Sequence, residues 1–361
     1  MQAALARGSK AVTAWDAWQS SVDIDKLDRN SQRLLPLLHQ NLRGQGVDSP
    51  LLSRFQGVHR ATWFKNQMML HRAAPILARL HEAGIRTMVL KGAALNLLYY
   101  TDYGLRSMDD VDILVPTEEA PAAIDVLAAS GLGPGQKPLK AFDERYFALR
   151  HGHGFADAAG RSIDLHWHAM LECCYPGADD DFWDGAVSTQ LDGEPTRALN
   201  ATDQLLHVCV HRAEWAAVPP LRWAADAMMI LDASLPDIDW DRLLAQVERR
   251  RLVLHVESAL SFLQDLLDAP VPSSVLKELR GMRVSRAERI EYQARTSLPG
   301  LGSVVAKLYF THTRAQRARR PLALPWLLSF PRSLQVGWAL DHVWQVPLYA
   351  AAHAGRGEGA H

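Results

Sequence analysis

The segment VLKGAALNLLYYTDYGLRSMDDVDILVP, residues 89–116, holds the most informative pattern in this chain of 361 residues. A short β-rich stretch, residues 85–90, ends at a lysine–glycine pair and is followed by a short helical stretch. A second apolar run then carries Asp110 and Asp112 against its hydrophobic pattern. An unpaired buried carboxylate is costly. Either these acids are solvated in a loop before a short strand, or a positive group meets them.

Strand alternation separates the three aspartates of this segment. Side chains on a strand point alternately to its two faces, so Asp110 and Asp112 share one face and the neighbouring hydrophobic residues point to the other. Asp109 has the register of the apolar face, and we therefore place it before the strand. Two carboxylates about 6.5–7 Å apart on one face repel each other unless a cation lies between them. Mg²⁺ suits this position because it prefers oxygen ligands.

A later strand-like run, SIDLHW at residues 162–167, repeats the pattern with Asp164 where a hydrophobic residue is expected. On a neighbouring strand, Asp164 could complete a metal site or accept the proton of an attacking hydroxyl. The alternative is a solvent-facing strand residue. His166 shares the face of Asp164 by alternation, so it is a candidate to support the carboxylates.

The Lys91–Gly92 pair stands where a strand passes into a helix. Glycine allows backbone N–H groups to approach a phosphate, and the N-terminus of a helix favours an anion. Lys91 would add a positive charge. The GxxxxGK[ST] spacing of a Walker A loop is absent, and the pair alone is also compatible with a plain turn.

Taken together, these features resemble the nucleotidyltransferase superfamily built on the polymerase-β palm. The sequence is most similar to a branch of uncharacterised bacterial nucleotidyltransferases with a Lys-Gly…Arg…Asp-x-Asp pattern, matched here by Lys91, Gly92, Arg106, Asp110 and Asp112. The resemblance implies an α+β fold: a polymerase-β-like core with a small mixed sheet, flanked by N-terminal and larger C-terminal helical regions. The expected regions are the N-terminal helices (1–84), the nucleotidyltransferase core (85–170), a C-terminal helical domain (171–352) and a disordered tail (353–361).

The resemblance also implies the chemistry, which is in-line attack of an acceptor on the α-phosphate of a nucleoside triphosphate, expected to be ATP, with release of pyrophosphate. Asp110 and Asp112 would hold Mg²⁺ or Mn²⁺. Asp164 would bind the catalytic metal and help to deprotonate the acceptor, a hydroxyl or phosphate group of an unidentified small molecule or protein.

By the same resemblance, the triphosphate would meet Lys91, Gly92, Ala93, Arg106 and Ser107. Ala93 offers a backbone N–H but, unlike the Gly or Ser of many relatives, no hydroxyl. Arg106 has an alternative role as the structural partner of Asp109 or Asp102.

The C-terminal helical region matches the family loosely through LLHVCVH and LRWAADAMMIL. His211, Arg222 and Asp226 are accordingly candidates to line the cleft. His207 and His211 share a helix face, but the Glu of an HExxH metalloprotease site is missing. Histidines packed between helices are the alternative.

Composition limits the class of protein. Lys and Arg number 39 against 40 acidic residues, a balance that gives no support to nucleic-acid binding. Three cysteines provide no disulfide framework, the N-terminus lacks a signal-peptide core, and no apolar run reaches the ~18–20 residues that span a bilayer. We expect a cytoplasmic protein. The competing hypothesis is a catalytically weak or inactive module that binds nucleotide or a partner through its helical surface.

Overall fold

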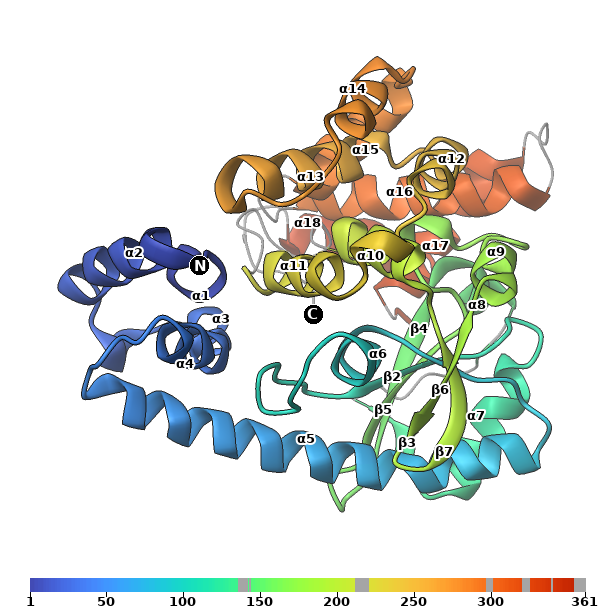
Figure 1. Cartoon of the computed structure of the whole chain (residues 1–361). Helices are drawn as coiled ribbons and strands as arrows, with labels where there is room; N and C mark the ends of the chain where they lie inside the picture. The colour runs from blue at the N-terminus through green and yellow to red at the C-terminus, as the bar shows by residue number, and fades with distance from the viewer. Residues whose placement is uncertain are drawn as a thin grey trace.

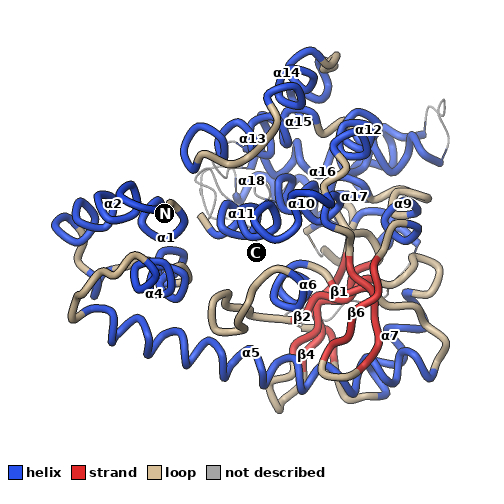
Figure 2. The backbone as a smooth tube through the Cα atoms, viewed as in Figure 1, coloured by secondary structure: helices blue, strands red, loops and turns tan. Residues whose placement is uncertain are grey.

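The computed structural model describes residues 1–135, 142, 144–211, 221–296, 301–319, 325–338 and 340–353. Helices at both ends of the chain flank a central sheet (Figures 1 and 2). The predicted disordered tail begins at His353, the last residue of the last helix, and its other residues lie outside the described part of the chain.

The N-terminal region is a group of short helices followed by one long helix, α5 (Leu51–Glu82). In Figure 1, α5 runs from the other N-terminal helices along the sheet. Leu70, Leu77 and Leu80 are buried at helical spacing and pack on the sheet, which gives α5 one apolar stripe. The preceding helices are α1 (Gln2–Leu5), α2 (Gly8–Ser21), η1 (Ile24–Lys26), α3 (Arg29–Gln32) and α4 (Leu35–Gly44).

The sheet is mixed, with strand order β3-β4-β5-β2-β1-β7-β6. β2 runs parallel to β5 and antiparallel to β1, and β1 runs parallel to β7. The predicted α+β class, with a mixed sheet between helical regions, is confirmed. The core elements are β1 (Met88–Val89), α6 (Lys91–Leu98), β2 (Val111–Leu114), α7 (Ala120–Ala129), β3 (Gly133–Pro134), α8 (Glu144–Leu149), β4 (Gly152–Ala156) and β5 (Ser162–His166).

Strand β2 has the two-sided character that its sequence predicts. Val111 and Ile113 point into the apolar core that α5 also lines, whereas Leu114 packs in the core on the other side. Asp112 shares the face of Leu114 by alternation and is 3% exposed. A carboxylate so deeply buried requires compensating charge.

Two strands lie in the region where the sequence led us to expect helices alone. They are β6 (Val187–Leu191) and β7 (Glu194–Ala198), which form a hairpin and extend the sheet beside β1. The turn residues Asp192 and Gly193 both have positive φ, at 48° and 88°, as a tight hairpin turn requires. The expectation was wrong because helical periodicity dominates on both sides of this short segment.

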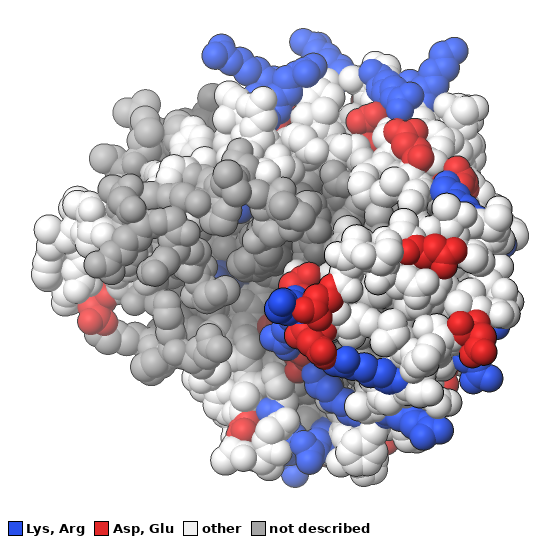
Figure 3. Space-filling view, turned by 90° about the vertical axis from the view of Figure 1, so that its left-hand side faces the viewer, with Lys and Arg blue, Asp and Glu red and all other residues white. Residues whose placement is uncertain are grey.

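The C-terminal helices stack above the sheet in Figure 1, and α6 lies between the sheet and the pair α10–α11. Lys and Arg lie beside Asp and Glu over much of the described surface on one face (Figure 3), in keeping with the near-zero net charge. Among the described residues, none of the helices combines the length and apolarity that crossing a membrane requires. The remaining elements are η2 (Leu171–Cys173), α9 (Asp180–Asp184), α10 (Ala201–His211), α11 (Arg222–Ser234), η3 (Leu235–Asp237), α12 (Trp240–Arg250), α13 (Val253–Leu267), α14 (Ser273–Gly281), α15 (Arg286–Thr296), α16 (Leu301–Arg319), α17 (Pro325–Gly337) and α18 (Gln345–His353).

Candidate active site

The centre of the site is a pair of carboxylates on two neighbouring parallel strands. The register of β2 and β5 places Asp112 directly beside Asp164. His166 follows on the same face of β5, and its Nε2 lies 3.0 Å from Asp112 Oδ1 and 3.1 Å from Asp164 Oδ2. Three residues from two segments some fifty positions apart thus meet around one point.

Charge sets the protonation of this cluster. Burial and Lys91 lower the pKa of His166, but Asp164 and Asp112 outweigh them and raise it to about 9. Burial raises the pKa of Asp112, but Lys91 and His166 hold it well below the usual range. Because an ionised carboxylate only accepts, the single Nε2–H of His166 is shared between Asp112 and Asp164.

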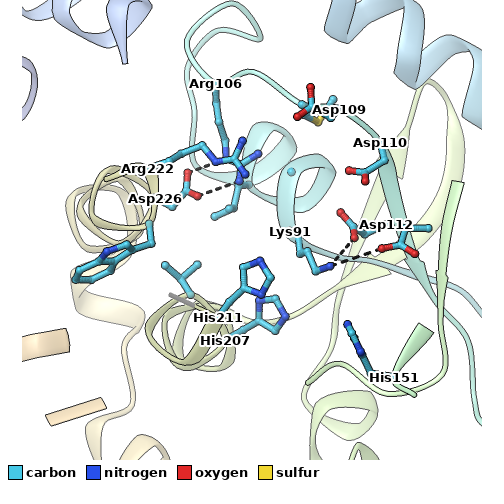
Figure 4. A pocket seen from close by; sticks show the side chains of 16 residues that line it. Lys91, Arg106, Asp109, Asp110, Asp112, His151, His207, His211, Arg222 and Asp226 are labelled. Atoms are coloured by element: carbon cyan, nitrogen blue, oxygen red, sulfur yellow. Dashed lines mark hydrogen bonds and ion pairs between the residues drawn. The ribbon is translucent and has the colours of Figure 1, made fainter. Parts of the chain in front are cut away.

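Lys91 enters the same cluster from the first residue of α6. Its Nζ lies 2.8 Å from Asp112 Oδ1, 3.9 Å from Asp164 Oδ2 and 3.3 Å from His166 Nε2 (Figure 4). Its backbone has φ +46°, a left-handed conformation that is uncommon outside glycine. Lys91 is thus the internal counter-ion of the acidic pair, rather than a side chain directed only at a phosphate.

Asp110 and Asp109 have different surroundings. Asp110 precedes β2, lines the same cavity as Asp112 and Asp164, and has a pKa raised to about 6 by burial and by those two carboxylates. Asp109 is exposed and is held by Arg29, Lys65 and other cations outside the cluster.

The acidic cluster has the composition of a divalent metal site. Ligand atoms of Asp112, Asp164 and His166 lie within 4.8 Å of one another. Two carboxylates with a third, Asp110, close by suit Mg²⁺ or Mn²⁺, which favour oxygen ligands. Burial, and after it the charges of Asp112 and Asp164, raise the pKa of Asp110, and a cation would offset the repulsion among the three carboxylates. The residues present therefore fit a divalent cation.

The N-terminal turn of α6 lies beside these carboxylates. Backbone N–H groups in the first turn of a helix have no partner within it and can receive an anion, and Gly92 and Ala93 hold these positions. A Cβ on Gly92 would lie 2.9 Å from both Arg106 Nη1 and Met108 Cγ. Glycine is therefore required here for the close approach of Arg106.

Arg106 joins the core to the opposite helical wall. Its Nε and Nη2 donate to Asp226 Oδ1 and Oδ2 of α11 at 2.7 and 2.9 Å, and the Tyr100 hydroxyl donates to Asp226 Oδ1 at 2.7 Å. All three side chains are buried. The structural partner of Arg106 is thus Asp226, rather than Asp109 or Asp102, because the folding of α11 onto the loop before β2 brings Asp226 into contact.

A cavity of about 350 Å³ separates the acidic cluster from this wall. Figure 4 shows Lys91 and the carboxylates on one side and the two histidines of α10 on another. The lining residues are Lys91, Gly92, Leu95, Arg106, Met108, Asp109, Asp110, Asp112, His151, Asp164, His207, Val208, His211, Arg222, Trp223 and Asp226.

A family model described as "Uncharacterised nucleotidyltransferase" matches residues 20–268, more than half of the chain. The chain belongs to this nucleotidyltransferase family. The match covers both the acidic cluster and the helical wall formed by α10 and α11. No curated protein shows significant similarity to the sequence.

Two solved structures are similar to this nucleotidyltransferase at low identity. One is the antibiotic-resistance factor ANT(2'')-Ia, with 14% identity, a TM-score of 0.35, and coverage of 55% of this chain and 96% of the other. The second is an antigenic nucleotidyltransferase-like protein from Paracoccidioides brasiliensis, with 13% identity, a TM-score of 0.38, and coverage of 58% and 92%.

Of the other candidate residues of the nucleotidyltransferase, His211 and Arg222 line the cavity, whereas Ala93 and Ser107 do not. His211 lines the cavity and its ring stacks on that of His207, whose Nε2 bonds to the Ala169 carbonyl oxygen at 3.0 Å. Arg222 also lines the cavity and donates to the Ser107 carbonyl oxygen at 3.4 Å. Ser107 itself is absent from the lining, and its Oγ has no hydrogen-bond partner among the described residues.

His151 and Trp223 line the cavity although the sequence did not mark them as site residues. His151 belongs to the tract HGHG at residues 151–154, which the sequence indicates either as a metal-binding tract or as a loop entering a strand. Its ring lies 5.0 Å from that of His166. Two histidines at the start of a strand that pairs with an acidic strand, His151 just before β4 and His153 within it, are a signal that could have indicated this position.

Proposed function

We propose that this nucleotidyltransferase transfers a nucleoside monophosphate, AMP from ATP, to a hydroxyl or phosphate group of an acceptor and releases pyrophosphate. The observation that carries the proposal is the pairing of Asp112 with Asp164 across two parallel strands, beside the N-terminal turn of α6. Its support for the proposal is that Asp110, Asp112 and Asp164, which could hold a metal, line one cavity together with Gly92 of the first turn of α6.

Asp110, Asp112 and Asp164 would hold Mg²⁺ or Mn²⁺. A bound divalent cation would neutralise charge on the phosphates and stabilise the attacking and leaving oxygens. Asp164, with a side chain 27% exposed against 4% for Asp112, is the more accessible carboxylate, and we assign to it the proton of the acceptor.

The remaining groups position the substrate. His166 donates to Asp112 and Asp164 and holds both carboxylates in orientation. The N–H groups of Gly92 and Ala93 would receive phosphate oxygens, because the first turn of α6 leaves them without helical partners. Positioning and charge stabilisation of this kind account for most of the catalysis of phosphoryl transfer.

One observation favours the alternative, a protein that binds nucleotide without efficient transfer. Lys91 and His166 already neutralise the carboxylates that would hold the metal. If this internal neutralisation were permanent, no divalent cation would enter. Calorimetric titration with Mn²⁺ separates the two functions, because the transferase requires a binding event and the alternative predicts none.

The decisive experiment follows pyrophosphate release from each labelled nucleoside triphosphate with Mg²⁺ or Mn²⁺, with and without candidate acceptors. Asp112→Asn should reduce release by about a hundredfold or more, as loss of a transition-state charge group does. Asp48→Asn, an exposed aspartate on the N-terminal side, is the matched control and should retain full release. Equal release by both variants would reject the assignment of Asp112.

We also place this protein in the cytoplasm, as proposed from the sequence. All three cysteines are free thiols and are buried: Cys173, Cys174 and Cys209. Free thiols in a chain of this length are typical of a reducing compartment.

A further inference from the structure

Asp109 is the meeting point of three cations that come from two parts of the fold. Arg29 Nη2, on α3, lies 3.1 Å from Asp109 Oδ1, and Lys65 Nζ, on α5, lies 2.8 Å from the same oxygen. Arg33, directly after α3, forms an ion pair with Oδ2. Cations of two N-terminal segments thus meet at one carboxylate of the loop before β2.

Around Asp109, positively charged side chains outnumber negatively charged ones. Arg222 of α11 contributes to the repulsion that lowers the pKa of Arg33 and of Lys65. Burial together with Arg222 and Arg29 lowers the pKa of Arg33 to about 10. Burial together with Arg33 and Arg29 lowers the pKa of Lys65. Arg106 adds to this repulsion, but Asp226 balances its charge. Three cations, Arg29, Arg33 and Lys65, thus contact the single carboxylate of Asp109, and a fourth, Arg222, lines the same cavity as Asp109.

This basic cluster (Arg29, Arg33, Lys65 and Arg222) adjoins the acidic one. Asp109 and Arg222 line the same cavity as Asp112 and Asp164. Figure 4 shows Asp109 and Asp110 one after the other on the segment that leads to Asp112. The Asp109 side chain is 38% exposed, so a ligand can reach the position that it occupies.

We propose that the basic cluster binds a phosphate-class anion of a substrate, and that Asp109 fills the anion position in the ligand-free protein. Arginine forks match phosphate oxygens in bidentate geometry, and an anion with two negative charges neutralises four cations better than one carboxylate does. The N-terminal helices then form part of the binding site. The assignment of this anion to a substrate of nucleotidyl transfer rests on the function proposed above.

The test is calorimetric titration of the full chain with inorganic pyrophosphate, without metal or nucleotide, at fixed ionic strength. Arg33→Ala should weaken binding about tenfold or more, the cost of hydrogen bonds to a charged group. Asp109→Asn should strengthen binding several-fold, because it removes the competing internal anion. Arg54→Ala is the matched control: Arg54 is an α5 arginine that pairs with the exposed Asp25 at 2.6 Å, and this variant should bind like the parent protein.

Arg33→Ala and Asp109→Asn both break ion pairs of the Asp109 carboxylate, yet they should change pyrophosphate binding in opposite directions. This difference separates an effect on binding from a simple loss of structure. Weaker binding by Asp109→Asn, or equal binding by Arg33→Ala and Arg54→Ala, would overturn the proposal. Asp112→Asn should retain pyrophosphate binding even if nucleotidyl transfer is lost, so the two proposals fail separately.

The anion has two possible sources, the terminal phosphates of the nucleotide or a phosphate on the acceptor. Titration repeated at saturating α,β-methylene ATP and Mg²⁺ distinguishes them. Binding of pyrophosphate that depends on Arg33 and persists under these conditions assigns the basic cluster to the acceptor. Its loss assigns the basic cluster to the nucleotide, and either result agrees with the proposal.

Discussion

The ammonium group of Lys91 lies 2.8 Å from Asp112 Oδ1, within the cluster that has the composition of a divalent metal site. The chain thus places its own cation where the proposed function requires a metal ion. The left-handed backbone of Lys91, φ +46°, carries a conformational cost of order 1–3 kcal/mol. Such strain at a site is compatible with a side chain that must leave when the metal binds.

Lys91→Met should therefore destabilise the metal-free protein and favour metal binding. Removing one partner of a buried ion pair costs about 3–5 kcal/mol; partial exposure of Lys91 and Asp164 reduces this to about 2 kcal/mol here. Because the internal competitor is gone, Mn²⁺ should bind more tightly to the variant. Urea denaturation in EDTA and in Mn²⁺ measures both effects. Equal stabilisation of variant and parent by Mn²⁺ would contradict the competition.

Asp110→Asn should stabilise the metal-free protein at neutral pH. Burial, Asp112 and Asp164 raise the pKa of Asp110 to about 6 from 3.8, so charging this carboxylate costs the folded state free energy as the pH rises from about 4 to 6. The gain should be absent near pH 4 and reach about 1–2 kcal/mol above pH 6, after allowance for the partial exposure of Asp110.

Denaturant titrations of Asp110→Asn and the parent protein in EDTA, at pH 4 and pH 7.5, check this window. Asp48→Asn, a change at an exposed carboxylate, is the control and should shift stability little at either pH. A gain for Asp110→Asn that is the same at both pH values would contradict the raised pKa.

Asp226→Asn should loosen the helical wall from the core. Asp226 accepts two hydrogen bonds from Arg106 and one from Tyr100, all buried, and its neutralisation leaves the Arg106 charge uncompensated. We expect a loss of about 3–5 kcal/mol in the free energy of unfolding. The double variant Arg106→Met/Asp226→Leu should lose less than Asp226→Asn, because it removes both charges. A larger loss in the double variant would show that packing, rather than charge, holds this contact.

Gly92→Ala adds only a methyl group to the site, and we expect this group to destabilise the protein by crowding. The new Cβ would lie 2.9 Å from Arg106 Nη1 and Met108 Cγ, and overpacking of this kind typically costs about 1–3 kcal/mol. Gly57→Ala on α5 meets no atom within 4 Å and should stabilise the protein by about 0.5–1 kcal/mol, the helix preference of alanine over glycine. Thermal unfolding of the two variants gives the comparison; destabilisation by both would remove the steric explanation.

Several features of this protein could be predicted from the local sequence pattern alone. The two-residue period of residues 110–115 separated Asp112 from the apolar face, and β2 has this alternation. The same period placed Asp109 before the strand, where the structure has it, but it was wrong to place Asp110 on the strand, because β2 begins at Val111. These features could be predicted because strand alternation depends only on neighbouring residues.

The hairpin of β6 and β7 was missed although a local signal existed. An Asp-Gly pair between alternating residues is a strong hairpin signal. Asp192-Gly193 stands between VSTQL (residues 187–191) and EPTRA (residues 194–198), but the alternation is incomplete because residues 188–190 are all polar. Both strands have few hydrophobic residues, and half of their residues are exposed. The hydrophobic period on which the prediction relied is weak here for that reason.

The sequence by itself determined the acidic strand, the glycine at the start of α6 and the mixed α/β character of the core. Only the tertiary structure decided that Asp164 stands beside Asp112, that Lys91 neutralises both, that Asp226 is the partner of Arg106, and that Asp109 joins the N-terminal helices to the site. The physical reason is the distance along the chain over which each kind of interaction acts. Alternation and capping act over a few residues, whereas these four pairings depend on strand register and helix packing between segments far apart in the chain.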